Sequence, residues 1–186
     1  MTELLSGDIC SVAEFLVHAL EMETESAERY RELADNMEVH NNPEVAALFR
    51  RLAAEGDAHA DQVKRRAGMY ELPDIAPWAF KWTSPDAPES AAMDDVHYLM
   101  DRRVALELAL HNEIRGQQFY TQVSDRSQNA EVECIARELA EEEEGHVMML
   151  REWLAKEADE PQPPLEDLDP PNMPEWAQST LFLFIA

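Results

Sequence analysis

The sequence predicts an all-α protein, a bundle of four helices arranged as two helical hairpins. Glycine is scarce, at 5 of 186 residues, and four long stretches carry apolar residues at the spacing of a helix. Short breakers separate the stretches within each pair, and one long proline-containing segment separates the pairs. The second pair also repeats letters of the first, which predicts a duplicated hairpin joined by a long crossover.

The first hairpin is expected to contain a helix from about Asp8 to Met37 and a second helix that ends near Gly68. The letters NNPE separate these two helices. We expect Asn42 to cap the second helix, with Pro43 in its first turn, where a missing N–H does not interrupt the helix.

A crossover over about residues 69–93 is expected between the hairpins. Its central part, residues 70–90, contains four prolines, so no α-helix is expected to run through it. Four aromatic residues in the same part favour packing along the surface of the bundle.

The second hairpin is expected to contain helices over about residues 94–125 and 130–157, with Asn129 as the cap of the latter. One bundle domain then spans residues 1–157. Residues 158–186 form an acidic, proline-rich tail with the apolar ending LFLFIA, which is too short to span a membrane.

The duplication is visible as identical letters at a constant offset. A shift of 90 residues superposes the first helix on the third, and a shift of 87 residues superposes the second on the fourth. The matches include a cap, apolar core positions and polar residues together, which favours a true repeat. The pairs that bear on function are Glu23 with Glu113, Tyr30 with Tyr120, Glu55 with Glu142, and His59 with His146.

One of these pairs places carboxylates where apolar residues are expected. Glu23 lies three residues after Leu20 in the apolar stripe of the first helix, and Glu113 holds the equivalent place in the third. A charged carboxylate inside a bundle is unfavourable unless it is paired or bound to a cation. Two of them at equivalent positions of a duplicated hairpin favour a functional role.

The other two helices carry histidines on their inner faces. Glu143 lies three residues before His146, so both side chains project from the same side of the helix, one turn apart. Glutamates from two helices and Glu-x-x-His pairs from the other two form the ligand set of carboxylate-bridged diiron bundles. The second pair is incomplete here, because Gly56 stands three residues before His59.

Helix geometry leaves open what takes the place of a carboxylate at Gly56. Glu55 lies on the inner face with His59, whereas Asp57 lies about 200° around the helix from that histidine. Either Glu55 completes the site, or water or a weaker second metal site takes its place.

Four segments resemble the rubrerythrin branch of the ferritin-like family over about residues 8–157, namely ALEMETESAERY, FRRLAAEGDAHA, ALELALHNEIRGQQFY and ELAEEEEGHVMML. The resemblance implies a ferritin-like four-helix bundle that binds two iron ions, and oxygen and imidazole ligands also suit manganese. By this resemblance, Glu23 and Glu113 would be terminal ligands, and Glu143 would bridge the two metals. His59 and His146 would supply nitrogen ligands, and Tyr30 and Tyr120 would lie close by.

The chain departs from that family in three places. Its two cysteines, Cys10 and Cys134, cannot form a four-cysteine rubredoxin domain, so the electron donor is expected to be a separate protein. Gly116 stands where many members carry a further carboxylate, and Gly56 stands where they carry the bridging glutamate of the second helix. Both cysteines are expected to be reduced and buried.

The function that the resemblance implies is reduction of hydrogen peroxide or dioxygen at the diiron site, with electrons from a rubredoxin-like donor or a reductase. Two alternatives stay open. One is an iron-binding or ferroxidase protein for iron handling, and the other is a bundle with a degenerate metal site that acts as an interaction module. A homo-oligomer is expected.

Charge and hydropathy argue against other classes of partner. The net charge of −24 at pH 7 would repel a phosphate backbone, so no nucleic-acid partner is expected. No run approaches the roughly 18 apolar residues of a membrane helix. The first ten residues lack the pattern of a signal peptide, so a cytoplasmic location is expected.

The remaining histidines are expected on flanks, ends or loops and outside the site. They are His18, His40, His97 and His111.

Overall fold

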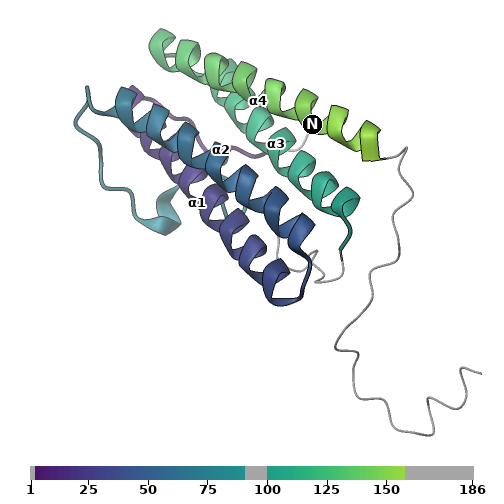
Figure 1. Cartoon of the computed structure of the whole chain (residues 1–186). Helices are drawn as coiled ribbons and strands as arrows, with labels where there is room; N and C mark the ends of the chain where they lie inside the picture. The colour runs from purple at the N-terminus through teal and green to yellow at the C-terminus, as the bar shows by residue number, and fades with distance from the viewer. Residues whose placement is uncertain (1–2, 91–99, 158–186) are drawn as a thin grey trace, which may run out of the picture.

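The computed structural model describes residues 3–90 and 100–157 and is drawn in Figure 1. The all-α prediction is confirmed, since the described residues contain four α-helices and no strand beyond one isolated bridge between Leu5 and Trp82. The expected tail, residues 158–186, lies outside the described part of the chain. The elements are α1 (Val12–Val39), α2 (Pro43–Ala67), a short 3₁₀ helix η1 (Pro77–Ala79), α3 (Arg102–Arg126) and α4 (Ala130–Glu157).

The helices pack as two hairpins, α1 against α2 and α3 against α4 (Figure 1). The backbones approach each other closely within each hairpin and at far fewer points between the hairpins. Side chains in the interior therefore carry much of the contact between the two halves. This arrangement agrees with the duplicated hairpin that the sequence predicts.

Two helices begin later than expected because a capping side chain fixes their first turn. α1 starts at Val12 rather than near Asp8, since Ser11 Oγ accepts a hydrogen bond of 3.2 Å from the N–H of Glu14. α3 starts at Arg102 rather than near residue 94, since Asp101 caps it. Residues 94–99 of that expected helix lie outside the described part of the chain.

The two asparagines expected as caps behave differently. Asn129 caps α4, because its Oδ1 accepts a hydrogen bond of 3.0 Å from the N–H of Glu131. Asn42 precedes α2, but its side chain makes no capping hydrogen bond. Its Nδ2 instead donates to the carbonyl oxygen of Met100 at 2.8 Å, which ties the α1–α2 turn to the segment before α3.

The described part of the crossover packs against α1, as the sequence predicts. His18 is fully buried there rather than on a flank, so the expectation for this residue is wrong. Its Nε2 accepts a hydrogen bond of 2.9 Å from the N–H of Lys81, and its Nδ1 donates to the carbonyl oxygen of Glu14 at 2.9 Å. Its ring also makes edge contacts with Phe80 and Trp82. His18 is thus a structural residue that docks the crossover on α1.

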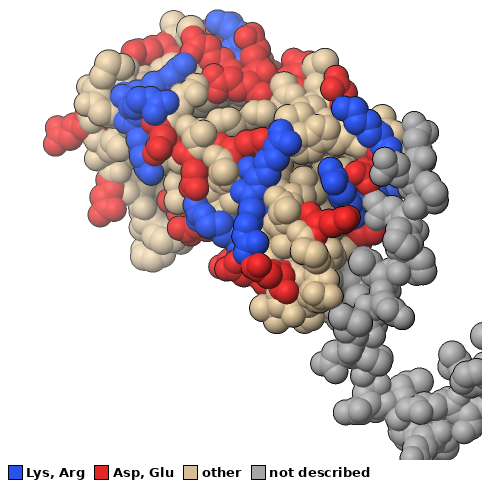
Figure 2. Space-filling view, in the orientation of Figure 1, with Lys and Arg blue, Asp and Glu red and all other residues tan. Residues whose placement is uncertain are grey.

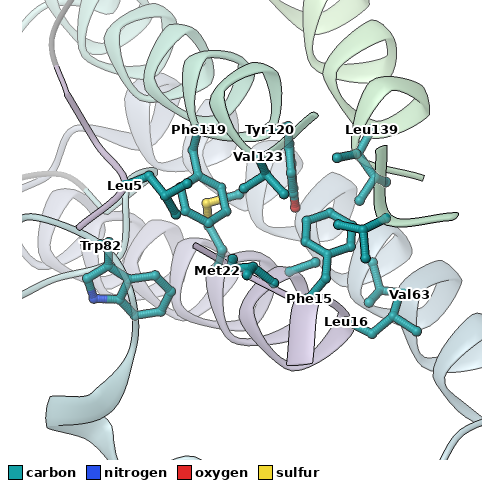
Figure 3. Close-up of a cluster of buried hydrophobic side chains, with 14 of the residues drawn as sticks. Leu5, Phe15, Leu16, Met22, Val63, Trp82, Phe119, Tyr120, Val123 and Leu139 are labelled. Atoms are coloured by element: carbon teal, nitrogen blue, oxygen red, sulfur yellow. The ribbon is translucent and has the colours of Figure 1, made fainter. Parts of the chain in front are cut away.

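Two apolar clusters form the core, and Figure 3 shows one of them. Along each of the four helices, the residues of one cluster lie toward one end and those of the other toward the opposite end. The glutamates and histidines singled out from the sequence fall between the two clusters on every helix. Apolar side chains therefore flank the candidate site on both sides. Central members are Phe15, Leu16 and Phe119 in the first cluster, and Leu33, Phe49 and Leu106 in the second.

The surface is strongly acidic, and Figure 2 shows acidic side chains spread over one face with basic ones between them. None of the described helices is both long and apolar enough to cross a membrane.

Cys10 and Cys134 are free but exposed, so the expectation that they are buried is wrong. Cys10 lies ahead of α1, and Cys134 lies on the outer face of α4 with its Sγ 3.7 Å from Glu138 Oε1.

Candidate metal centre

All four helices contribute to one polar cluster between the two apolar clusters. Each hairpin supplies one glutamate–histidine pair. In the first hairpin, Nδ1 of His59 on α2 lies 3.6 Å from Oε2 of Glu23 on α1. In the second, Nδ1 of His146 on α4 lies 3.3 Å from Oε2 of Glu113 on α3. The structure therefore brings together four of the residues that the sequence predicts for the site.

Glu143 connects the two pairs. Its Oε2 lies 3.0 Å from Nδ1 of His146. Its side chain belongs to two groups whose donor atoms all lie within 4.8 Å of one another, one with His59 and His146 and one with Glu23 and Glu89. Glu143 is therefore the one residue that the two groups share.

Glu89 is the functional candidate that the sequence reading missed. It lies in the crossover, only 3% exposed, and its Oε1 has no hydrogen-bond partner among the described residues. The proline-containing segment around it has no helical periodicity that would assign the side chain to an inner face. The sequence offered one indirect signal. Gly116 on α3 stands where many members of the family carry a carboxylate, so a carboxylate from elsewhere in the chain could take its place.

Glutamate oxygens and imidazole nitrogens in a buried cluster fit iron or manganese as ligands. A carboxylate buried without a partner is unfavourable, and a cation beside it removes that penalty. The unpartnered Oε1 of Glu89 and the four crowded glutamates are therefore consistent with a metal centre.

Burial and mutual repulsion shape the protonation of this cluster. Burial, reinforced by neighbouring carboxylates, raises the pKa of Glu89 and of Glu143 well above the ordinary value. Burial alone would also raise the pKa of Glu113, but hydrogen bonds with His146 and Glu143 lower it overall. Burial disfavours the charged form of His146, yet Glu113 outweighs it and raises the pKa of this imidazole. Metal binding would displace the protons that these groups hold.

The two tyrosines lie beside the cluster. The hydroxyl of Tyr120 donates a hydrogen bond of 2.9 Å to Oε1 of Glu23, which leaves Oε2 of this glutamate facing His59. Tyr30 lines a small cavity together with Glu23 and His59. Its hydroxyl accepts a hydrogen bond of 3.4 Å from Nδ2 of Asn112. Burial raises the pKa of both tyrosines well above its ordinary value, so they remain neutral hydrogen-bonding groups.

Glu55 and Gly56 line the edge of the cavity. Oε1 of Glu55 accepts a hydrogen bond of 3.1 Å from Nε of Arg51, and the side chain is about a third exposed. Its oxygens belong to neither group of close donor atoms. A Cβ on Gly56 would lie 3.1 Å from Cβ of Ala27, so the glycine lets α1 and α2 approach closely. Asp57 is exposed and pairs with Arg31, away from the cluster.

The unfilled space among these side chains is small. Its volume is about 10 Å³, and it is lined by residues that include Glu23, His59, Glu113 and His146. About this volume is needed to hold one water molecule. The space therefore suits an ion or a molecule of a few atoms.

Comparisons with known proteins identify the family of the chain. The chain is 39% identical to an uncharacterised conserved protein from Magnetospirillum magnetotacticum, whose crystal structure it matches with a TM-score of 0.63 over 84% of this chain and 99% of that one. No curated protein matches the sequence. The sequence profile of the rubrerythrin family matches residues 14–77 and 105–171, which include every ligand candidate on the four helices. The chain belongs to the rubrerythrin family of ferritin-like diiron proteins.

Proposed function

We propose that this protein is a diiron oxidoreductase that reduces hydrogen peroxide or dioxygen with electrons from a separate donor protein. The observation that carries the proposal is the pair of Glu–His sets, one from each hairpin, that converge on Glu143. The small volume between them supports an oxidant of only a few atoms.

In this proposal Glu23 and Glu113 act as terminal ligands, His59 and His146 supply nitrogen, and Glu143 lies between the two metal positions. Manganese is the alternative metal, because the same ligands suit it. The bound metal ions supply the redox chemistry, and reduction of one peroxide to two waters takes up two electrons and two protons.

The surrounding residues prepare the site for that reaction. Tyr120 holds one oxygen of Glu23 and thereby orients the other oxygen toward His59. The two apolar clusters limit the access of water from either end of the bundle.

The electron donor is proposed to be another protein, such as a rubredoxin-like protein or a reductase, because two cysteines cannot build a four-cysteine iron site.

The cytoplasm is the proposed location of the protein. Cys10 and Cys134 are free and exposed, which fits a reducing compartment. We also propose self-association, with the exposed apolar side chains of Met69 and Trp78 in the crossover as candidate contacts. Light scattering coupled to gel filtration measures the oligomeric state.

The experiment that tests this function is rapid mixing of the di-ferrous protein with hydrogen peroxide. We expect oxidation that is fast and saturable in peroxide, and NADH-linked turnover when a rubredoxin and its reductase are added. Slow oxidation that rises linearly with peroxide, without turnover, would contradict the proposal.

A second candidate function is iron handling by a ferroxidase. The net charge of −24 favours it, because an acidic surface attracts ferrous ions. The distinguishing measurement is the amount of iron that the protein retains after aerobic addition of excess ferrous ion. Mineral cores of many ions per chain favour iron handling, whereas saturation at two ions per chain favours the oxidoreductase.

A further inference from the structure

We propose that Glu89 is a metal ligand supplied by the crossover, and that it takes the position a carboxylate on α3 would occupy if residue 116 were glutamate. This inference rests on the proposed function, because it assumes that the cluster binds metal ions. It adds to the centre a ligand from outside the four helices.

The first support is the place of the Glu89 carboxylate. It is buried among the ligand candidates, and its donor atom lies within 4.8 Å of those of Glu23 and Glu143. No donor among the described residues satisfies its Oε1. Buried carboxylate oxygens are normally hydrogen-bonded or bound to a cation. The oxygen therefore has the surroundings of a ligand rather than of a structural acid.

The second support is the space that Gly116 leaves. A Cβ on this residue would overlap Oε1 of Glu89 and would lie 2.7 Å from its Cγ and its Cδ. The carboxyl end of Glu89 thus occupies the volume in which a side chain on α3 would begin. Glycine weakens a helix interior, and residue 116 lies in the middle of α3. Access for Glu89 is a physical reason for glycine at this position.

The third support is a clamp that holds the crossover in place. Glu25 on α1 accepts hydrogen bonds from the N–H of Ala87 at 3.3 Å and from Oγ of Ser90 at 2.7 Å. The N–H of Ser90 also donates to the carbonyl oxygen of Ala87 at 3.0 Å, which closes a turn around Glu89. The clamp lies two residues from Glu23 on the same helix. It therefore fixes the crossover ligand relative to a helix ligand.

The test compares the metal affinity of the wild type with that of three single variants. Metal-free protein is titrated with Mn²⁺, and the free ion is counted by its EPR signal. We expect Glu89→Gln and Gly116→Ala each to weaken one of the two bound ions by about tenfold or more. Gly145→Ala is the matched control, because a Cβ there meets nothing within 4 Å, and it should leave both affinities unchanged. Circular dichroism verifies that each variant is folded.

Moving the carboxylate from residue 89 to residue 116 tests directly whether both residues can supply a ligand at the same position. In the background of Glu89→Ala, the substitution Gly116→Glu places a carboxylate in the vacated volume, and we expect it to restore the lost affinity. A double variant that binds Mn²⁺ no better than Glu89→Ala overturns the shared position. Wild-type affinity in both Glu89→Gln and Gly116→Ala overturns Glu89 as a ligand. A wild type that binds no metal instead overturns the proposed function, which separates the two failures.

Discussion

The imidazole rings of His59 and His146 stack across the bundle, with centroids 4.6 Å apart and planes inclined by 15°. These residues are equivalent in the two halves of the duplicated chain, so the stack marks the place where the hairpins meet. The backbones of the hairpins make few close contacts with each other. A metal centre at this junction would therefore join the two halves as well as perform chemistry.

Metal binding should accordingly stabilise the protein against unfolding. A ligand at 100 times its Kd adds about 2.7 kcal/mol to the free energy of unfolding. For a chain of this length, that corresponds to a rise in Tm of about 5–10 °C. Calorimetry of metal-free protein with and without Mn²⁺ measures the change, and Mg²⁺, which prefers oxygen ligands, serves as the control. Equal melting temperatures with and without Mn²⁺ would show that the cluster is not a metal centre.

Tyr120→Phe should destabilise the protein while leaving both metals bound. The change removes the hydroxyl that donates to Oε1 of Glu23, and a buried acceptor without its donor costs about 1–3 kcal/mol. Urea unfolding gives the free energy, and metal analysis gives the content. Tyr30→Phe is the matched control with a smaller expected effect, because its hydrogen bond to Asn112 is longer, at 3.4 Å. A loss of metal from Tyr120→Phe alone would assign this tyrosine a direct role in binding.

Glu55→Ala should retain two metals per chain. The carboxylate pairs with Arg51 and lies outside both groups of close donor atoms, so we expect its removal to change metal affinity less than removal of Glu89. Metal content after desalting is the measurement. Loss of one ion from Glu55→Ala would instead make Glu55 the ligand that compensates for Gly56.

Stability should fall on mild acidification because His18 is buried. Burial lowers the pKa of His18, although Glu14 opposes the shift and Lys81 adds to it. Below about pH 6.5 the unfolded chain takes up a proton that the folded chain resists, so the stability associated with neutral His18 is lost as the pH falls. We expect wild type to lose more stability than His18→Gln between pH 7.5 and pH 5.5. The metal-free forms are compared, so that titration of the metal ligands is common to both, and parallel pH profiles would contradict this role for His18.

The helical residues of the site were predictable because duplication and periodicity both act along helices. Glu23, Glu113, Glu143, His59 and His146 fall on inner faces at equivalent positions, and the structure brings them together. These same signals fail in the crossover, where nothing periodic assigns a side chain to the interior. Glu89 was missed for that reason.

Local hydrogen bonds account for the other differences between sequence and structure. Helix starts were placed too early, since apolar periodicity does not register the capping side chains of Ser11 and Asp101. His18 was placed on a flank because its partners, Lys81 and the aromatic residues beside it, are more than 60 residues away in sequence. The wider arrangement of the four helices followed from their amphipathic faces.

The most direct test of the proposed diiron centre is iron analysis of wild type, Glu143→Ala and Glu142→Ala after anaerobic loading and desalting. Glu143 is shared by both groups of donor atoms, whereas Glu142 accepts hydrogen bonds from Gln62 and provides a matched control. We predict two irons per chain in wild type and in Glu142→Ala, and less than one in Glu143→Ala. Two irons retained by Glu143→Ala, or none by wild type, would contradict the account.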